Sequence, residues 1–129
     1  CQSSFSSNCL NFRDPFVWRD GEGWLMVIGT GLKDVGGAVL LYRSADLRTW
    51  EYLNVVHTGA FGAGEVMWEC PNLFALGDRH LLLVSEQPEF KYTYYTLGHF
   101  DGRRFTPGES GKTDAGRFLY AALTMEDTE

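Results

Sequence analysis

Two acidic side chains stand beside prolines at a fixed spacing in this sequence. Asp14 directly precedes Pro15, and Glu69 is separated from Pro71 by Cys70. The prolines lie 56 positions apart, an aromatic residue stands one or two positions before each acid, and an apolar run lies beyond each proline. A repeat of this length that carries several short strands predicts a propeller blade or another repeated β unit. Two carboxylates delivered by neighbouring repeats to a shared centre are the groups that glycoside hydrolysis requires.

Glu69 has the neighbours that a general acid needs. Trp68, Cys70 and the apolar pair Val66 and Met67 are expected to exclude water from its carboxyl group. Loss of water favours the protonated form, which is the form that can donate a proton to a glycosidic oxygen. Residue type alone favours a simpler role, in which Glu69 caps a strand end or pairs with an arginine, because structural ion pairs are common. We predict that Cys70 is a small packing residue with a possible influence on Glu69.

Asp14 and Arg13 also allow two interpretations. Aspartate before proline often initiates a turn, and Arg13 could be a solvated charge. Alternatively, the Asp14 carboxylate accepts hydrogen bonds from sugar hydroxyls that strengthen as positive charge develops on the sugar. Arg13 could then orient carboxylates in the site through its forked geometry.

The elements that position these residues are predicted to be short antiparallel strands. No segment shows a sustained helical period, aromatic residues make up 15% of the chain, and the 15 glycines suit tight turns. A glycine-rich loop is predicted over 31–37 and a polar segment over 86–91, with turns over 19–23, 77–79 and 101–104. The predicted strands of the first unit are 15–18, 24–29, 38–44 and 51–58, and those of the second unit are 66–76, 80–85, 92–98 and a short strand at Phe105.

The predicted fold class is all-β, with about two four-stranded antiparallel blades and the start of a third. The blade-like units cover about 12–58 and 66–112, and the next blade begins near 117, with 118–125 as its first strand. Open blade edges would leave apolar strands unprotected, so we expect the chain to be a piece of a longer protein. The first residues lack the basic and apolar regions of a signal peptide, and the sequence indicates no compartment.

Composition excludes several classes of function. The formal net charge is -6 and Lys and Arg are scattered, which argues against nucleic acid as a partner. No apolar run approaches the roughly 20 residues that span a bilayer, so no membrane partner is expected. The three cysteines and three histidines have no zinc-site spacing, and we expect no metal and no organic cofactor. The oligomeric state is not indicated.

Four motifs in order give the chain a family resemblance. The sequence resembles glycoside hydrolase family 32, which contains invertases, levanases, inulinases and related β-fructofuranosidases. The likeness covers nearly the whole chain from about Leu10 and implies part of a five-bladed propeller of the kind that precedes a β-sandwich in that family. It also implies a carbohydrate substrate and retaining cleavage of β-fructofuranosidic bonds in sucrose or fructans. The motifs are Phe12-Arg13-Asp14-Pro15, Leu41-Tyr42-Arg43-Ser44 with Asp46-Leu47 and Trp50, Trp68-Glu69-Cys70-Pro71, and Asp114 and Gly116 with Tyr120-Ala121.

The resemblance also implies roles for particular residues. Glu69 matches the general acid/base of the family, and Asp14 matches its transition-state stabiliser. Substrate-binding roles are implied for Arg13, Trp68, Tyr120 and Asp114, although Tyr120 and Asp114 would equally suit a structural role in a blade turn. The other tryptophans are predicted to lie in the core: Trp18, Trp24 and Trp50.

The sequence departs from the family at two places. The nucleophilic aspartate of the family lies in an Asn-Asp-Pro-Asn-type string, which does not occur in these residues, so we expect the isolated 129-residue chain to be inactive. Ala122 and Leu123 follow Tyr120-Ala121, where the family usually has proline and glutamine. The alternatives are a related five-bladed glycosidase that acts on arabinosides or xylosides and a non-catalytic carbohydrate-binding propeller piece. The Glu-Cys-Pro string favours the fructofuranosidase.

Overall fold

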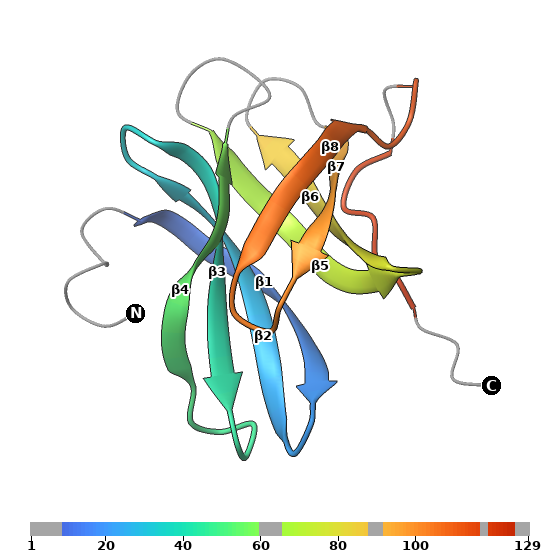
Figure 1. The fold of residues 1–129 in the computed structure, drawn as a ribbon. Helices are drawn as coiled ribbons and strands as arrows, with labels where there is room; N and C mark the ends of the chain where they lie inside the picture. The colour runs from blue at the N-terminus through green and yellow to red at the C-terminus, as the bar shows by residue number, and fades with distance from the viewer. Residues whose placement is uncertain (1–8, 60–65, 88–91, 117–118, 126–129) are drawn as a thin grey trace.

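In the computed structural model of the chain, the described residues form two four-stranded antiparallel sheets (Figure 1). The structure describes residues 9–59, 66–87, 92–116 and 119–125. Each sheet follows chain order, with neighbouring strands joined as hairpins. The all-β prediction is confirmed. The strands of the first sheet are β1 (Cys9–Asp20), β2 (Gly23–Leu32), β3 (Gly36–Ser44) and β4 (Glu51–Gly59), and those of the second are β5 (Met67–Leu76), β6 (Arg79–Gln87), β7 (Tyr92–Phe100) and β8 (Phe105–Lys112).

The hairpin turns have the residue types that tight turns require. Gly21, Gly77 and Gly102 adopt positive φ at the β1–β2, β5–β6 and β7–β8 turns, where a residue with a Cβ atom would be strained. In the last of these turns, the carboxylate of Asp101 accepts hydrogen bonds from the backbone N–H groups of Arg103 and Arg104. These turns were predicted from the sequence, and they set the strand order.

The prediction of a glycine-rich loop over 31–37 is wrong at both ends, because strands occupy its first and last residues. β2 continues to Leu32 and β3 begins at Gly36, with Gly31 paired to Gly37 across the two strands. Gly37 is required by packing, since a Cβ atom at this position would overlap the indole ring of Trp68 in the other sheet. Glycines occur in loops, and they also occur in strands where another part of the chain lies very close. The sequence alone does not distinguish the two cases.

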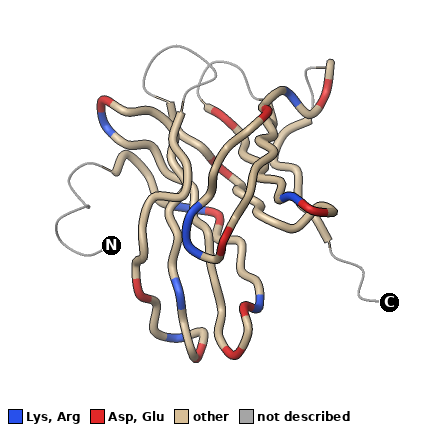
Figure 2. Tube along the Cα trace, in the orientation of Figure 1, with Lys and Arg blue, Asp and Glu red and all other residues tan. Residues whose placement is uncertain are grey.

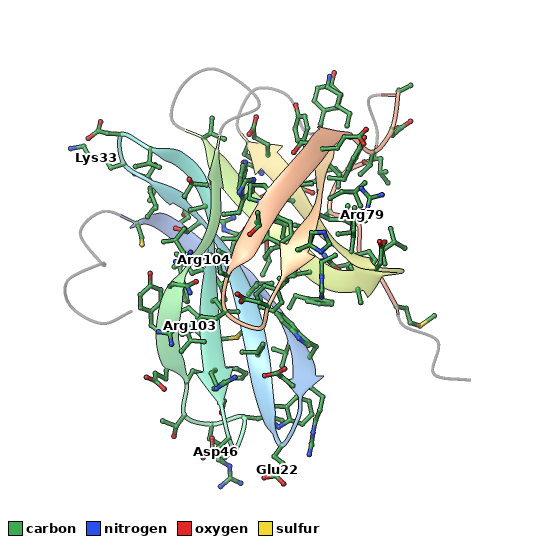
Figure 3. The ribbon with its side chains drawn as sticks, viewed as in Figure 1. Glu22, Lys33, Asp46, Arg79, Arg103 and Arg104 are labelled. Atoms are coloured by element: carbon green, nitrogen blue, oxygen red, sulfur yellow. The ribbon has the colours of Figure 1, made fainter. Side chains whose placement is uncertain are left out.

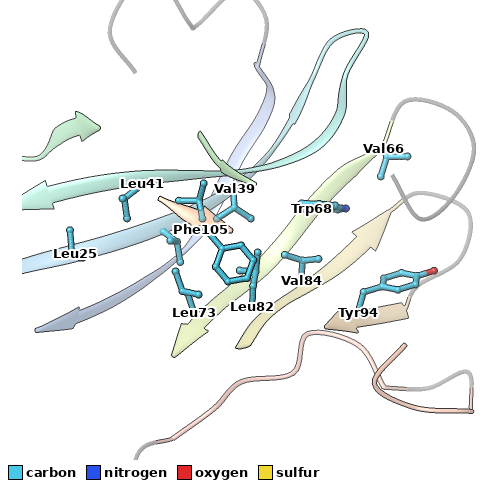
Figure 4. Close-up of a cluster of buried hydrophobic side chains, with 12 residues drawn as sticks. Leu25, Val39, Leu41, Val66, Trp68, Leu73, Leu82, Val84, Tyr94 and Phe105 are labelled. Atoms are coloured by element: carbon cyan, nitrogen blue, oxygen red, sulfur yellow. The ribbon is translucent and has the colours of Figure 1, made fainter. Parts of the chain in front are cut away.

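The hydrophobic core lies between the two sheets (Figure 4). β5 packs against β1, β2 and β3, and β8 contacts β4. Alternate residues of β2 serve the two faces of the first sheet, as expected for a strand in the middle of a sheet: Leu25 and Val27 enter this core, whereas Met26 and Ile28 belong to a smaller cluster on the opposite face. The main cluster contains Leu25, Val27, Val39, Leu41, Val56, Val66, Trp68, Leu73, Leu82, Val84, Tyr94 and Phe105.

The predicted core tryptophans are partly buried. Trp18 packs against the main core, and Trp50 packs against the smaller cluster on the outer face of the first sheet. Trp24 is also partly buried, and the guanidinium of Arg19 lies 5.0 Å from the centre of its ring.

The first strand of each sheet carries the same irregularity. β1 starts at Cys9, six residues before the predicted start at Pro15, and it contains a bulge after Arg13. β5 has the equivalent bulge after Glu69. The residues directly after these two positions, Asp14 and Cys70, have φ values of 59° and 47°. A bulge bends a strand and re-aims its side chains, so both repeats turn the chain at the residues singled out by their chemistry.

The predicted third unit stays a prediction, as does the assignment of the two sheets to blades of one propeller domain. The described residues 119–125 form no strand, although they lie along the second sheet. The side chain of Asn72 donates to the carbonyl oxygen of Ala122 and accepts from the backbone N–H of Thr124.

The polar segment predicted over 86–91 differs at its start, because β6 extends to Gln87 and Glu86 is buried. Residues 88–91 lie outside the described part of the chain.

Charged residues are scattered over the described part of the chain (Figure 2). Many lie at the hairpin ends: Glu22 and Asp46 are at one end of the first sheet and Lys33 is at the other (Figure 3). In Figure 2 the blue segments are separated from one another, and several adjoin red ones. In the described ranges we find no helix with the length and apolarity needed to cross a bilayer.

Candidate active site

The bulges of β1 and β5 bring Arg13 and Glu69 together. Glu69 is only 5% exposed, and its Oε1 atom lies 3.0 Å from Nη1 of Arg13. The Arg13 side chain is 48% exposed, so the ion pair joins a half-exposed guanidinium to a buried carboxylate. Its other nitrogen, Nη2, donates to Oδ1 of Asn11 over 3.0 Å, which fixes the guanidinium plane between β1 and β5.

The second oxygen of Glu69 has two further donors. Nε2 of Gln87, at the end of β6, donates to Oε2 over 2.9 Å. The Tyr120 hydroxyl donates to the same oxygen and also accepts a hydrogen bond of 2.9 Å from Gln87 Nε2. Burial and the hydrogen bond to Glu69 raise the pKa of Tyr120, so its hydroxyl keeps its proton and remains a donor. Glu69 is therefore held by three side chains from three different segments.

The Asp14 carboxylate lies against the residue that follows Glu69. Its Oδ2 atom accepts the backbone N–H of Cys70 over 3.1 Å and lies 3.5 Å from the Cys70 sulfur. Burial, followed by the nearby charge of Asp14, raises the pKa of the Cys70 thiol to about 11. Cys70 is therefore a neutral thiol near neutral pH. This supports the prediction that it is a packing residue, and it also anchors Asp14 beside the acid.

Close packing of the two sheets sets the position of Glu69. A Cβ atom on Gly29 of β2 would overlap the carbonyl oxygen of Trp68 and would lie 3.3 Å from Cα of Glu69. The backbone of β5 can therefore run directly over β2 only because residue 29 is glycine. At the equivalent place in the second sheet, Ser85 uses its hydroxyl to accept the backbone N–H of Ala121. This bond positions the segment that carries Tyr120.

The predicted site residues fall into two groups. The structure brings four of them together: Arg13 and Tyr120 form hydrogen bonds with Glu69, and Asp14 accepts one from the next residue, Cys70. The remaining two, Trp68 and Asp114, lie elsewhere.

The predicted substrate-binding role of Trp68 is wrong. Its side chain is 0% exposed and its Nε1–H donates to the buried carboxylate of Glu86 over 3.0 Å. Side chains alternate along a strand, so the neighbour of a residue that faces the site faces the core. Asp114 is exposed, and its Oδ1 accepts the N–H of Gly116 in a local turn. This position agrees with the structural alternative for Asp114, and neither residue is retained as a proposed substrate contact.

Sequence reasoning missed three residues of the site: Asn11, Gly29 and Gln87. Gln87 lies inside a segment predicted only as polar, and 18 positions separate it from Glu69. Pairing of Met67 with Gln87 and of Glu69 with Ser85 brings the Gln87 and Glu69 side chains to the same end of the sheet. That proximity depends on strand register, which the sequence does not state. Among the described residues, no group of three or more His, Cys, Asp or Glu side chains could hold a metal ion.

Comparison with known proteins identifies the family. The model of the glycosyl hydrolases family 32 N-terminal domain matches residues 2–129. The chain belongs to glycosyl hydrolase family 32. The two four-stranded sheets are consistent with a portion of the β-propeller domain of that family.

Relatives agree with this membership. A sucrose-6-phosphate hydrolase of Salmonella typhimurium is 39% identical over 127 residues, which cover 88% of this chain and 27% of that protein. A raffinose invertase of Escherichia coli is 44% identical over 78 residues, or 60% of this chain and 16% of that protein. The solved structure of a Bombyx mori GH32 β-fructofuranosidase is 35% identical to this chain and superposes with a TM-score of 0.81. The match covers 92% of this chain and 28% of the Bombyx mori chain. The chain spans about a quarter of the length of the sucrose-6-phosphate hydrolases of Salmonella typhimurium and Klebsiella pneumoniae.

Proposed function

We propose that the protein containing this chain hydrolyses β-fructofuranosidic bonds in sucrose or fructans, with Glu69 as acid/base and Asp14 as transition-state stabiliser. The observation that carries the proposal is the pair of carboxylates held on adjacent bulges. Glu69 is buried among the donors Arg13, Gln87 and Tyr120, while Asp14 is anchored to the backbone N–H of Cys70. Two carboxyl groups fixed beside one another from neighbouring sheets suit the two-carboxylate chemistry of glycosidases. Membership of family 32 and the names of the relatives support the same class of substrate.

In the proposed reaction, Glu69 gives its proton to the oxygen that leaves with glucose or with the rest of a fructan. The bond between that oxygen and the fructosyl carbon breaks, and its electron pair goes to the leaving oxygen. A nucleophilic carboxylate from outside these 129 residues attacks the same carbon, about 5–5.5 Å from Glu69 as in other retaining enzymes. Water then attacks that carbon while the Glu69 carboxylate takes a proton from it. The bond between the carbon and the nucleophilic carboxylate breaks, its electron pair returns to the carboxylate, and fructose is released. The negative charge of Asp14 stabilises the positive charge that develops on the sugar ring, and its free oxygen is available for a sugar hydroxyl.

The proposal predicts a split between substrates for Glu69→Gln in the full-length protein. Glucose is a poor leaving group and needs a proton, so kcat/KM on sucrose is expected to fall by about 10²–10⁴-fold. An activated aryl fructoside needs almost no protonation, so its fructosyl-transfer step is expected to change little. Added azide should then restore turnover of the trapped intermediate, because azide needs no general base. Steady-state kinetics on both substrates, with and without azide, measure these effects.

Asp14→Asn is the companion variant, with the opposite expectation. Charge stabilisation is needed whatever group departs, so both substrates are expected to lose similar fractions of kcat/KM. Equal losses on both substrates for Glu69→Gln, without azide rescue, would make Glu69 a structural residue. Assays of the wild-type protein on sucrose, sucrose 6-phosphate, inulin, levan and aryl arabinosides and xylosides separate the alternatives. Cleavage of pentosides alone selects the related glycosidase, and binding without cleavage of any of them selects the carbohydrate-binding piece.

A further inference from the structure

The donors around Glu69 are distributed unequally between its two oxygens. Oε1 accepts one hydrogen bond, from Arg13 Nη1 at 3.0 Å. Oε2 accepts two, from Gln87 Nε2 at 2.9 Å and from the Tyr120 hydroxyl. Each oxygen of a carboxylate has about two acceptor positions. The acceptor positions of Oε2 are therefore both occupied, whereas one position of Oε1 is available.

When Glu69 is ionised, the hydrogen-bond pattern makes the Gln87 amide nitrogen the donor. Gln87 Nε2 carries two protons, and the structure gives it two acceptors, Glu69 Oε2 and the Tyr120 oxygen. The Tyr120 proton then points to Oε2, since its raised pKa keeps the phenol neutral. Turning the Gln87 amide around would place its oxygen against the ionised carboxylate, which is unfavourable. The amide N–H group therefore faces Oε2 while Glu69 is ionised.

We infer that Gln87 is a positioning residue for the reaction, and that its contacts with Oε2 and with Tyr120 hold the Glu69 carboxyl in the orientation from which its proton is transferred. The Gln87 amide contacts both the carboxyl and the phenol that donates to the same oxygen, so its removal loosens two contacts of Glu69 at once. The inference deepens the proposed function and rests on it, because proton transfer from Glu69 is the step that this orientation serves. The proton moves from Glu69 to the leaving oxygen, and the O–H electron pair remains on the carboxylate.

Substitution of Gln87 in the full-length protein tests this inference. In Gln87→Leu the Glu69 carboxyl loses one donor and its fixed orientation, so kcat/KM on sucrose is expected to fall about tenfold or more. The aryl fructoside needs little protonation, so kcat/KM on this substrate is expected to change less than about twofold. The remaining carboxylate has fewer donors to stabilise its charge, so the alkaline limb of the pH profile on sucrose should move to higher pH. If Gln87 had only a structural role, its loss would lower kcat/KM on both substrates by the same factor. The alkaline limb of the pH profile would then stay in place.

A matched control removes an amide elsewhere in the same fold. Asn54 on β4 donates its Nδ2 to the carbonyl oxygen of Arg103 over 2.8 Å. Asn54→Leu is expected to leave both the substrate ratio and the pH profile unchanged. If Gln87→Leu does not fold, Tyr120→Phe removes the other donor of Oε2 with the loss of a single oxygen. Its control is Tyr95→Phe, which removes a hydroxyl that contacts Glu109 at 3.4 Å on an exposed surface.

A crystal structure of each variant separates this inference from the proposed function. The Glu69 carboxyl is expected to turn or to occupy more than one orientation in Gln87→Leu and Tyr120→Phe, and to stay fixed in the two controls. If the wild-type protein cleaves no fructoside, the proposed function fails, and the orientation of Glu69 alone decides whether Gln87 positions it. An unchanged orientation, or equal losses on both substrates, overturns the inference.

Discussion

At the residue scale, the burial of Glu69 is offset by the donors that replace water. A buried carboxylate is costly unless it is paired and hydrogen-bonded, and breaking a buried pair by removing one partner typically costs about 3–5 kcal/mol. Arg13, Gln87 and Tyr120 meet that need from β1, β6 and the segment after β8. The same residues stabilise the carboxylate that acts as base in the second half of the proposed reaction.

Cys70 provides a prediction of reactivity at this scale. Its pKa of about 11, against an ordinary value of 9.0, makes the thiolate about 100-fold rarer at pH 8. Alkylation of Cys70 by iodoacetamide in the folded full-length protein is therefore expected to be about 100-fold slower than alkylation of an unperturbed thiol peptide. The rate should keep rising with pH until about pH 11. Peptide mapping by mass spectrometry gives the rate.

The protein unfolded in urea is the control for Cys70. There the thiol loses its buried surroundings and the Asp14 carboxylate, so it should react at the rate of the peptide. Rapid labelling of the native protein at pH 8 would contradict the placement of Cys70 against Asp14.

At the element scale, two bulges and one strand glycine position the site. The bulges at Asp14 and Cys70 give successive repeats the same bend, and Gly29 lets β5 run over β2 at the level of Glu69. Each bulge requires a non-glycine residue at positive φ, a conformation that persists only where the surrounding contacts hold it. Here those contacts are the Asp14–Cys70 hydrogen bonds between the sheets.

Gly29→Ala is expected to damage both stability and activity. Its Cβ would overlap the Trp68 carbonyl oxygen, so β5 must shift and carry Glu69 with it. Overpacking of this kind typically costs about 1–3 kcal/mol. A displacement of the acid by a fraction of an ångström is expected to lower kcat/KM on sucrose as well. Denaturant unfolding and kinetics on the full-length protein measure the two effects.

Gly77→Ala is the matched control for Gly29→Ala. Gly77 has a φ of 62° in the β5–β6 turn, with open space where a Cβ would lie. Alanine there is expected to cost about 1–2 kcal/mol of backbone strain without changing kcat/KM. Activity loss that is equal in the two variants would mean that Gly29 does not position Glu69.

At the scale of the whole molecule, an aromatic contact joins the two sheets. The His57 ring on β4 lies with its centroid 5.4 Å from that of Trp68 on β5 and 5.9 Å from that of Phe105 on β8. Burial lowers the pKa of His57, so the folded protein holds the neutral imidazole. Protonation would place a charge in the packed region between the sheets.

The lowered pKa of His57 predicts how stability depends on pH. Below an unfolded-state pKa of about 6.5 the unfolded chain binds a proton that the folded chain resists, so unfolding is favoured as pH falls. The stabilisation is present above about pH 6.5 and is lost progressively as pH falls below that value. His57→Phe is expected to flatten the decline of Tm between pH 7 and pH 5 in the full-length protein. The exposed His99 is the control, and His99→Phe should leave the slope as it is in the wild type.

The sequence by itself determined the fold class and the repeated pair of acidic motifs, and it supplied the candidate residues of the site. Strand alternation, turn residues and the spacing of the Asp14 and Glu69 motifs are local properties, so they can be read directly from the order of residues. The family resemblance added Arg13 and Tyr120, which the structure places in the same cluster as Glu69.

Only the tertiary structure decided which side chains meet. Trp68 is adjacent to Glu69 in sequence but faces the core, because neighbours on a strand point to opposite sides. Gln87 reaches Glu69 through strand register, and Gly29 and Gly37 are glycines because the other sheet lies against them. Register and sheet packing depend on contacts between residues far apart in the chain. For that reason the sequence singled out Glu69 as the proposed acid, whereas the fold decided which groups hold it.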